Sequence, residues 1–198
     1  MIYGERIRFR GIERVDLPTF VNWLNDPDVR QGILVHQPVS QAGEENWFER
    51  MLKRSPDEHV LGIEVRLPGE AGLPSEAGSP GEAGGEVQWK LIGSLAFNDI
   101  DWRSRISEFG IMIGDKTYWN RGYGTEAVRL LAKHGFNTLN LNRIFLHVFE
   151  NNPRAIRAYE KAGFVHEGRE RQAEFKQGEY MDVLVMSILK DEFDQENP

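Results

Sequence analysis

Two glycines at alternate positions mark a segment of this sequence that could bind an anion. Residues 118–127 read YWNRGYGTEA, and this run is expected to follow a strand and to open a helix. Glycine at such a junction allows a tight turn and close approach of a ligand to the backbone. The free N–H groups of the first helical turn and the helix dipole favour negative charge there, and Arg121 adds a positive charge. A pyrophosphate group fits such a site.

This glycine pattern differs from two better-known phosphate-binding motifs. The Gly-Lys-Ser/Thr end of a P-loop is missing, and so is the third glycine of a dinucleotide-binding fingerprint. The loop therefore predicts an anion site without naming its ligand. Taken alone, it also fits a glycine-containing loop that binds nothing.

A second motif lies about thirty residues further on, directly after the next expected strand. Residues 151–164 read NNPRAIRAYEKAGF. Together the two segments resemble the GNAT superfamily of N-acetyltransferases, which use acetyl-coenzyme A. The first resembles the family's Gln/Arg-x-x-Gly-x-Gly/Ala loop, with Trp119 in place of the usual Gln or Arg. The second resembles its Asn-x-x-Ala-x-x-x-Tyr-x-x-x-Gly-Phe helix through Asn152, Ala155, Tyr159, Gly163 and Phe164.

The resemblance implies how acetyl-CoA would be bound. The pantetheine arm would lie in the gap of a splayed strand pair and would pair with the backbone of Met112, Ile113 and Gly114. A backbone N–H of this segment would also hold the carbonyl oxygen as it becomes an oxyanion. Because backbone N–H groups do most of the anion binding in such a loop, Trp119 should be tolerated. The remaining implied contacts are Asn120, Arg121, Gly122, Tyr123, Gly124 and Thr125 for the pyrophosphate, Asn152 for the pantetheine, and Arg154 and Arg157 for outer phosphates.

Two residues are candidates for proton transfer. Tyr159 matches the family's tyrosine near the thioester sulfur, and a phenol can protonate a departing thiolate without being ionised at rest. The attacking amine must itself lose a proton, and Glu108, at the start of the splayed strand, is the leading candidate for the base. A solvated carboxylate at the strand end is the alternative interpretation of Glu108. Weaker candidates for the base are Glu174, Asp99 and Asp101.

The elements that must position these residues follow from apolar periodicity and capping signals. Asp16 is expected to cap a first helix. Ser40 is expected to cap a second, with Trp47, Phe48, Met51 and Leu52 inward, and residues 25–39 are expected to form a loop between the two. Further elements are expected as strands at 7–10, 59–66, 89–97, 108–113, 143–149, 164–175 and 180–189, and as helices at 122–138 and 153–162.

These elements predict an α/β fold, an α+β mixed sheet with helices on its faces. With the resemblance, they imply one GNAT acyl-CoA N-acyltransferase domain over residues 1–198, with a splayed central strand pair. One segment is foreign to this pattern: residues 67–84 read LPGEAG, LPSEAG and SPGEAG, three near-copies of one hexapeptide. We expect a flexible low-complexity insert at about 67–86, at the tip of a hairpin between two strands.

Composition excludes several classes of function. The formal net charge of −7 disfavours a general nucleic-acid binder and leaves room for cationic ligands. The absence of cysteine excludes disulfides, thiolate metal sites and a cysteine nucleophile, and the five histidines show no metal-ligand spacing, so no metal is expected. We read these histidines as surface or core residues. Neither a membrane span nor a signal peptide is recognisable, so a cytoplasmic protein is expected.

The function expected from these observations is acetyl transfer from acetyl-CoA to a primary amine, by direct attack in a ternary complex. Residues 106–189 look most like spermidine/spermine and ribosomal-protein N-terminal acetyltransferases, which makes a polyamine or other small cationic amine the first choice of acceptor. An N-terminal acetyltransferase and a non-catalytic acyl-CoA sensor are the alternatives. Acceptor choice is expected to lie around residues 25–39 and Glu44–Glu45. The final hairpin offers an edge for a homodimer or higher homo-oligomer.

Overall fold

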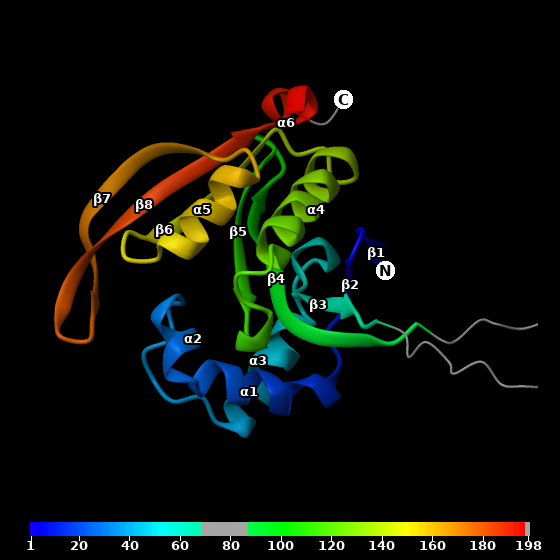
Figure 1. The fold of residues 1–198 in the computed structure, drawn as a ribbon, viewed down its shortest axis with the longest axis vertical. Coiled ribbons are helices and arrows are strands. Elements are labelled where there is room, and N and C mark those ends of the chain that lie inside the picture. The colour runs from blue at the N-terminus through cyan, green and yellow to red at the C-terminus, as the bar shows by residue number, and fades with distance from the viewer. Residues whose placement is uncertain (69–86, 197–198) are drawn as a thin grey trace, which may run out of the picture.

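The computed structural model describes residues 1–68 and 87–196, and the strands of this part of the chain form one sheet in the order β1-β2-β3-β4-β5-β6-β8-β7. Figure 1 shows this sheet with its helices. The strands are β1 (Ile2–Tyr3), β2 (Ile7–Gly11), β3 (Leu61–Arg66), β4 (Trp89–Asp101), β5 (Ile106–Ile113), β6 (Arg143–Phe149), β7 (Val165–Lys176) and β8 (Glu179–Leu189). The helices are α1 (Leu17–Asn25), α2 (Pro27–Gln31), α3 (Gln41–Met51), α4 (Tyr123–Asn137), α5 (Pro153–Lys161) and α6 (Lys190–Glu196).

The two central strands separate part of the way along their length. β5 and β6 run parallel and pair only from Ile106 opposite Arg143 to Glu108 opposite Phe145. Beyond that point β5 stays with β4 as far as Ile113, while β6 stays with β8 as far as Phe149. The splayed strand pair expected from the sequence is therefore present, and it leaves the inner edge of β5 open.

Helices cover both faces of the sheet. α4 and α5 pack over the larger core, which includes Phe97, Phe109 and Leu131. α1 and α3 pack around a smaller core with Phe20 at its centre, and Met112 of β5 joins this second cluster. Since alternate side chains of a strand point to opposite faces, β5 contributes to both cores. Figure 1 shows α4 and α5 beside the open part of the sheet, with α1, α2 and α3 below it.

Four details of the N-terminal half differ from the sequence-based expectations. Residues 25–39 are not all loop, because Asp26 accepts hydrogen bonds from the N–H groups of Asp28 and Val29 and so caps the short helix α2. Asp16 precedes α1 but does not cap it, because its carboxylate binds Arg10 at 2.6 and 2.8 Å instead. Leu52 lies beyond the end of α3 and is 47% exposed rather than inward. Strand β1 is an addition that the sequence analysis did not contain.

The chain on either side of the repeated hexapeptides forms the expected hairpin. β3 and β4 pair antiparallel, with Arg66 opposite Trp89, and the Leu67 N–H donates to the Gln88 carbonyl at 2.9 Å. The rest of the predicted insert, residues 69–86, lies outside the described residues. No helix within residues 1–68 and 87–196 is long and apolar enough to cross a membrane.

Candidate active site

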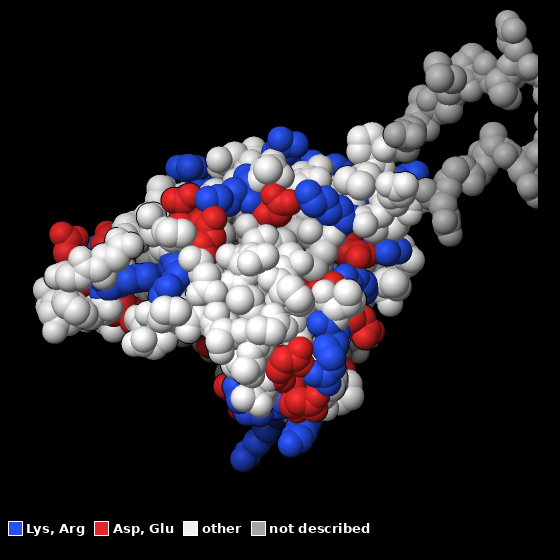
Figure 2. All heavy atoms as spheres, turned by 90° about the horizontal axis from the view of Figure 1, so that it is seen from below, with Lys and Arg blue, Asp and Glu red and all other residues white. Residues whose placement is uncertain are grey.

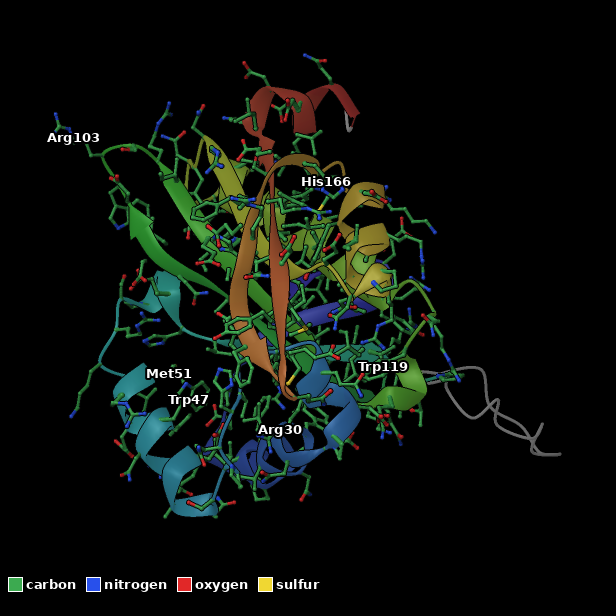
Figure 3. All side chains as sticks on the ribbon, turned by 90° about the vertical axis from the view of Figure 1, so that its left-hand side faces the viewer. Arg30, Trp47, Met51, Arg103, Trp119 and His166 are labelled. Atoms are coloured by element: carbon green, nitrogen blue, oxygen red, sulfur yellow. The ribbon has the colours of Figure 1, made fainter. Side chains whose placement is uncertain are left out.

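A cleft of about 920 Å³ opens where β5 and β6 separate. One of its ends is formed by the glycine loop and the first turn of α4, and α5 lines one side. α1, α3 and the α2–α3 connection form the other end, around Phe20, Glu44 and Trp47. Figure 3 shows Trp47 and Trp119 to either side of the β7–β8 hairpin, with Arg30 below the hairpin tip.

The glycine loop presents backbone donors to this cleft. Asn120 and Gly122 both adopt left-handed conformations, with φ of 59° and 83°, which turn the chain sharply into α4. The first hydrogen bond into α4 runs from the Glu126 N–H to the Gly122 carbonyl, and no side chain caps this helix. Within the described residues, the N–H groups of Tyr123, Gly124 and Thr125 therefore have no partner. A Cβ at Gly124 would meet no atom within 4 Å, so the backbone there is open to a ligand.

Arg6, near the N-terminus, forms hydrogen bonds that fix the position of this loop. Its guanidinium Nε donates to Glu126 Oε2 at 2.7 Å, its Nη1 donates to the Arg121 carbonyl at 3.1 Å, and it lies 4.6 Å from the centre of the Tyr123 ring. The one carboxylate in the first turn of α4 is thereby neutralised by a cation from the other end of the chain. The free N–H groups keep their preference for an anion.

The open edge of β5 presents backbone groups on alternate residues. The Gly114 N–H donates to the Ile92 carbonyl on β4 at 2.9 Å. Because hydrogen-bonded residues alternate along an antiparallel strand, Met112 also bonds toward β4, and the amides of Ile111 and Ile113 point into the splay. Of the three residues expected to pair with a pantetheine arm, Ile113 has the required orientation. Met112 lines the cleft, although its amide faces β4.

Gly114, the third residue expected to pair with the pantetheine arm, is not among the residues that line the cleft, and its N–H is used by the Ile92 carbonyl. A Cβ at Gly114 would lie 2.1 Å from an indole carbon of Trp23, so glycine is needed here for packing of α1 against the sheet. Arg121 is not among the residues that line the cleft, and its guanidinium lies 5.8 Å from the ring centre of Tyr118. The groups of the cleft that could hold an anion are therefore the backbone N–H groups of the loop and the cations of α5.

Trp119, which replaces the family's usual Gln or Arg, has a defined structural role. Its indole N–H donates to the Ile113 carbonyl at 2.7 Å, which ties the glycine loop to the end of β5. The guanidinium carbon of Arg154 lies 3.4 Å from the centre of the indole ring. Trp119 thus places a cation of α5 beside the loop. Burial lowers the pKa of Arg154, and Tyr159 acts in the opposite direction.

Tyr159 lies on α5 between the two separated strands. Its ring is 8% exposed and packs edge-on against Phe109 of β5, with ring centres 5.9 Å apart. Burial raises the pKa of Tyr159 to about 12, although Arg154 acts to lower it. Tyr159 also lines the cleft. It is therefore a neutral phenol, held in place by apolar packing and facing the space where the strands part.

His147 is a residue that the sequence analysis missed. Its Nδ1 lies 2.7 Å from Glu108 Oε1, and its Nε2 lies 3.8 Å from Glu170 Oε1. All three residues line the cleft. Glu108 is opposite Phe145 in the parallel register, and His147 lies two residues further along β6, on the same face of the sheet. This alternation was visible in the sequence, but the register that brings Glu108 and His147 together was not.

The weaker candidates for the base lie in different parts of the structure. Glu174 lines the cleft, whereas Asp99 pairs with Arg54 on the surface and Asp101 caps the turn after β4 by accepting from the Arg103 and Ser104 N–H groups. The Asn152 carboxamide oxygen accepts from the Ala155 N–H and so caps α5. Asn152 and Arg157 both line the cleft.

Among residues 1–68 and 87–196, no three His, Asp or Glu side chains gather as a metal site would require.

The β7–β8 hairpin is fastened to the connection between α2 and α3. The Lys176 ammonium donates to the carbonyls of Arg30 and, at 2.6 Å, Ile33, and lies 4.9 Å from the Phe149 ring centre. Burial lowers the pKa of Lys176, and the charge of Arg30 acts in the same direction. The C-terminal hairpin and the α2–α3 connection are thus joined across the cleft, where the hairpin contributes Glu170 and Glu174 to the wall.

Splayed strands beside a helix N-terminus with free backbone donors form the arrangement used by N-acyltransferases, and this is the class of enzyme that the fold and the cleft define. Residues 6–165 match the family described as acetyltransferase (GNAT) domain. The chain therefore belongs to the GNAT family and is an N-acetyltransferase, as the two sequence motifs indicate.

Individual relatives support the same assignment. The chain is 30% identical over 194 residues to a protein named uncharacterized N-acetyltransferase p20 of Bacillus licheniformis, and the match covers 97% of each. It is 34% identical over 108 residues to a spermidine N(1)-acetyltransferase of Vibrio cholerae, which is 54% of this chain and 62% of that one. A solved structure of spermidine N-acetyltransferase from Vibrio cholerae in complex with CoA and spermine matches with a TM-score of 0.78 at 26% identity, covering 96% of this chain and 99% of that chain.

Proposed function

We propose that this enzyme transfers the acetyl group of acetyl-CoA to a primary amine of a small cationic molecule, a polyamine first among them, while both substrates are bound. The observation that carries the proposal is the separation of charge in the cleft. Every Lys and Arg among its described lining residues lies on α5, as Arg154, Arg157 and Lys161. The carboxylates of the wall come from elsewhere: Glu44, Glu108, Glu170 and Glu174.

This division suits one anionic and one cationic substrate. The free N–H groups of the α4 terminus and the nearby cations of α5 favour the phosphates of a nucleotide. The four carboxylates favour a positively charged acceptor in the remaining part of the cleft. The structural similarity to an enzyme solved with CoA and spermine supports this pairing. The charge distribution thus supports a proposal in which the two substrates occupy different parts of one cleft.

The residues of the cleft fit acetyl-CoA. Asn120, Gly122, Tyr123, Gly124 and Thr125 would hold the pyrophosphate by backbone groups, and the open edge of β5 at Ile111 and Ile113 would pair with the pantetheine arm. Asn152, Arg154 and Arg157 line the adjoining wall. When bound, acetyl-CoA would supply an acetyl group activated as a thioester.

Proton transfer is assigned to two sites. An alkylamine is mostly protonated at neutral pH, so it must lose a proton before its nitrogen attacks the acetyl carbon. Glu108, hydrogen-bonded to His147, is the proton acceptor in this proposal, acting directly or through a water molecule. As the new C–N bond forms and the C–S bond breaks, Tyr159 gives its phenolic proton to the departing sulfur. An amide N–H on the open edge of β5 holds the carbonyl oxygen.

The test is a thiol-release assay with acetyl-CoA and four kinds of amine. These are the polyamines spermidine and spermine, an aminoglycoside, peptides with a free N-terminus, and an alkylamine that carries no charged group besides its one amine. Polyamines are expected to give the highest kcat/KM. A preference for the peptides would instead assign the enzyme to N-terminal acetylation. Calorimetric binding of acetyl-CoA without turnover of any of these amines would overturn the proposed activity.

A further inference from the structure

At the end of the cleft formed by α1 and α3, one buried carboxylate has no counter-charge among residues 1–68 and 87–196. Glu44 lies on α3 in register with Phe48 and Met51, at positions i, i+4 and i+7, which is the face that packs on the sheet. Glu44 is only 5% exposed to solvent. Within the described part of the chain, no side chain or backbone group forms a hydrogen bond or ion pair with its carboxylate. The neighbouring Glu45, by contrast, pairs with Arg14 on the outer side of α3.

The Glu44 carboxylate opens into the cleft. No side-chain oxygen or nitrogen of the described residues is both sealed from solvent and unpartnered, so the carboxylate of Glu44 must reach open space, and the cleft is the space that it lines. The wall around it is apolar, with Phe20, Leu24, Trp47 and Val60. Figure 3 shows Trp47 on α3, at the end of the cleft away from Trp119.

Such a carboxylate costs stability unless something binds it. An unpaired charge in apolar surroundings is unfavourable, and burial raises the pKa of Glu44. Two of the other three acidic residues of the cleft differ from Glu44, since Glu108 and Glu170 both face His147, and Glu174 is not buried among apolar side chains as Glu44 is. A leucine at position 44 would satisfy the packing of α3 better than glutamate does. The position therefore fits a ligand-binding role better than a structural one.

We propose that Glu44 receives a second cationic group of the acceptor, one that is separated by an alkyl chain from the amine that is acetylated. This inference rests on the proposed function and specifies it: the preferred acceptor is a linear diamine or polyamine rather than a monoamine. The carboxylate binds the distal ammonium, the face of Trp47 offers a further favourable contact for that cation, and the apolar wall accommodates the methylene chain. Glu44 thus determines specificity and takes no part in the chemical step.

The experiment compares 1,4-diaminobutane with n-pentylamine, which have similar length and differ in the second ammonium group. In the native enzyme kcat/KM is expected to be higher for the diamine. Glu44→Gln should lower it by about tenfold to a hundredfold, as expected for a lost charge-assisted contact, mainly through KM. The value for n-pentylamine should fall much less, because the monoamine has no second ammonium group to pair with residue 44. Glu45→Gln is the matched control, because it removes the same charge from the adjacent residue outside the cleft, and it should keep the diamine preference.

A second variant gives a readout that is independent of turnover. Glu44→Leu should raise the melting temperature of the free enzyme, because it removes an unpaired buried carboxylate, while it abolishes calorimetric binding of 1,4-diaminobutane. Equal kcat/KM for diamine and monoamine in the native enzyme would overturn the role of Glu44 and leave acetyl transfer intact. If no amine is acetylated, the proposed function fails, and binding of the diamine to native and Glu44→Gln proteins still decides the role of Glu44.

Discussion

The indole N–H of Trp119 donates a 2.7 Å hydrogen bond to the carbonyl oxygen of Ile113. This bond connects the end of the open strand to the loop in which we propose an anion site, so the backbone donors of β5 and α4 are held as one unit. The resemblance implies that the family's usual Gln or Arg at this position contacts the diphosphate with its side chain. Trp119 instead supports the loop through its hydrogen bond to the backbone. Its ring also positions the Arg154 guanidinium.

Replacing Trp119 by phenylalanine keeps a ring beside Arg154 and removes the hydrogen bond to Ile113. One hydrogen bond contributes roughly 1 kcal/mol, so acetyl-CoA is expected to bind about fivefold more weakly by isothermal titration calorimetry. Trp102→Phe is the control, because Trp102 is half exposed at the turn after β4. Unchanged affinity in the Trp119→Phe protein would show that the loop is held by other contacts.

The open backbone at Gly124 allows the phosphate site to be blocked without disturbing the fold. A side chain there meets no neighbouring atom, and Gly124→Glu brings both bulk and negative charge to the free N–H groups of α4. Acetyl-CoA binding should become undetectable by calorimetry, while the melting temperature stays close to that of the native protein. Gly124→Ala, which adds only a methyl group, separates the effect of charge from that of the backbone. Retained binding in Gly124→Glu would place the phosphates elsewhere.

Tyr159→Phe tests the proton donor. The phenylalanine ring keeps the edge-on packing against Phe109, so acetyl-CoA affinity should be nearly unchanged, while kcat falls by about 10²-fold or more because the departing sulfur loses its acid. Calorimetry and a thiol-release assay on the same preparation separate the two effects. An unaltered kcat would remove Tyr159 from the mechanism.

The burial of Tyr159 also predicts a pH-dependent contribution to stability. The pKa of its phenol is about 12 in the folded protein and about 10 in an unfolded chain. Between these values only the unfolded state loses the proton, so the stability that the neutral phenol contributes is fully present below pH 10 and is lost as the pH rises toward 12. At pH 11 the free energy of unfolding should have fallen by about 1 kcal/mol more in the native protein than in Tyr159→Phe. Chemical denaturation at pH 9 and 11 measures this difference.

The hydrogen bond between Glu108 and His147 predicts non-additive effects. If the pair accepts the amine proton as one unit, Glu108→Gln and His147→Gln should each lower kcat by about 10²-fold, and the double variant should be little worse than either. The loss should shrink as the pH approaches the pKa of an alkylamine, about 10, because the acceptor then arrives without its proton. Additive losses, or losses independent of pH, would show that the pair serves only to shape the cleft.

The second half of the chain could be read from the sequence because its signals are local. Asn152, Pro153 and Gly163 mark the ends of α5, and the spacing from Asn152 to Tyr159 and Phe164 sets which residues share its inner face. The glycine loop was likewise recognisable from Gly122 and Gly124. These features depend on φ preferences and on capping within one or two turns, so a linear pattern is enough to find them.

Two residues outside the cleft, Asp16 and Gly114, could not be read in this way. The Asp16 carboxylate has a capping position in the sequence, but Arg10 lies close enough in the folded chain to bind it instead. Likewise Gly114 resembles a ligand-binding glycine, yet its missing side chain makes room for Trp23. In both cases a side-chain contact that forms only in the folded chain overrides a local preference.

What the sequence by itself determined is the glycine-loop and Asn152–Phe164 motifs, whose conformation is local, and through them the resemblance to the family, which implied the splayed sheet. The backbone anion site remains a prediction from the same loop. What only the tertiary structure decided is the set of side chains that face one another across the cleft. The pairing of Glu108 with His147 requires the register of β5 against β6, and the isolation of Glu44 requires α3 to close over the smaller core. Charge pairing and burial depend on neighbours that are remote in sequence, and for that reason they appear only in the folded protein.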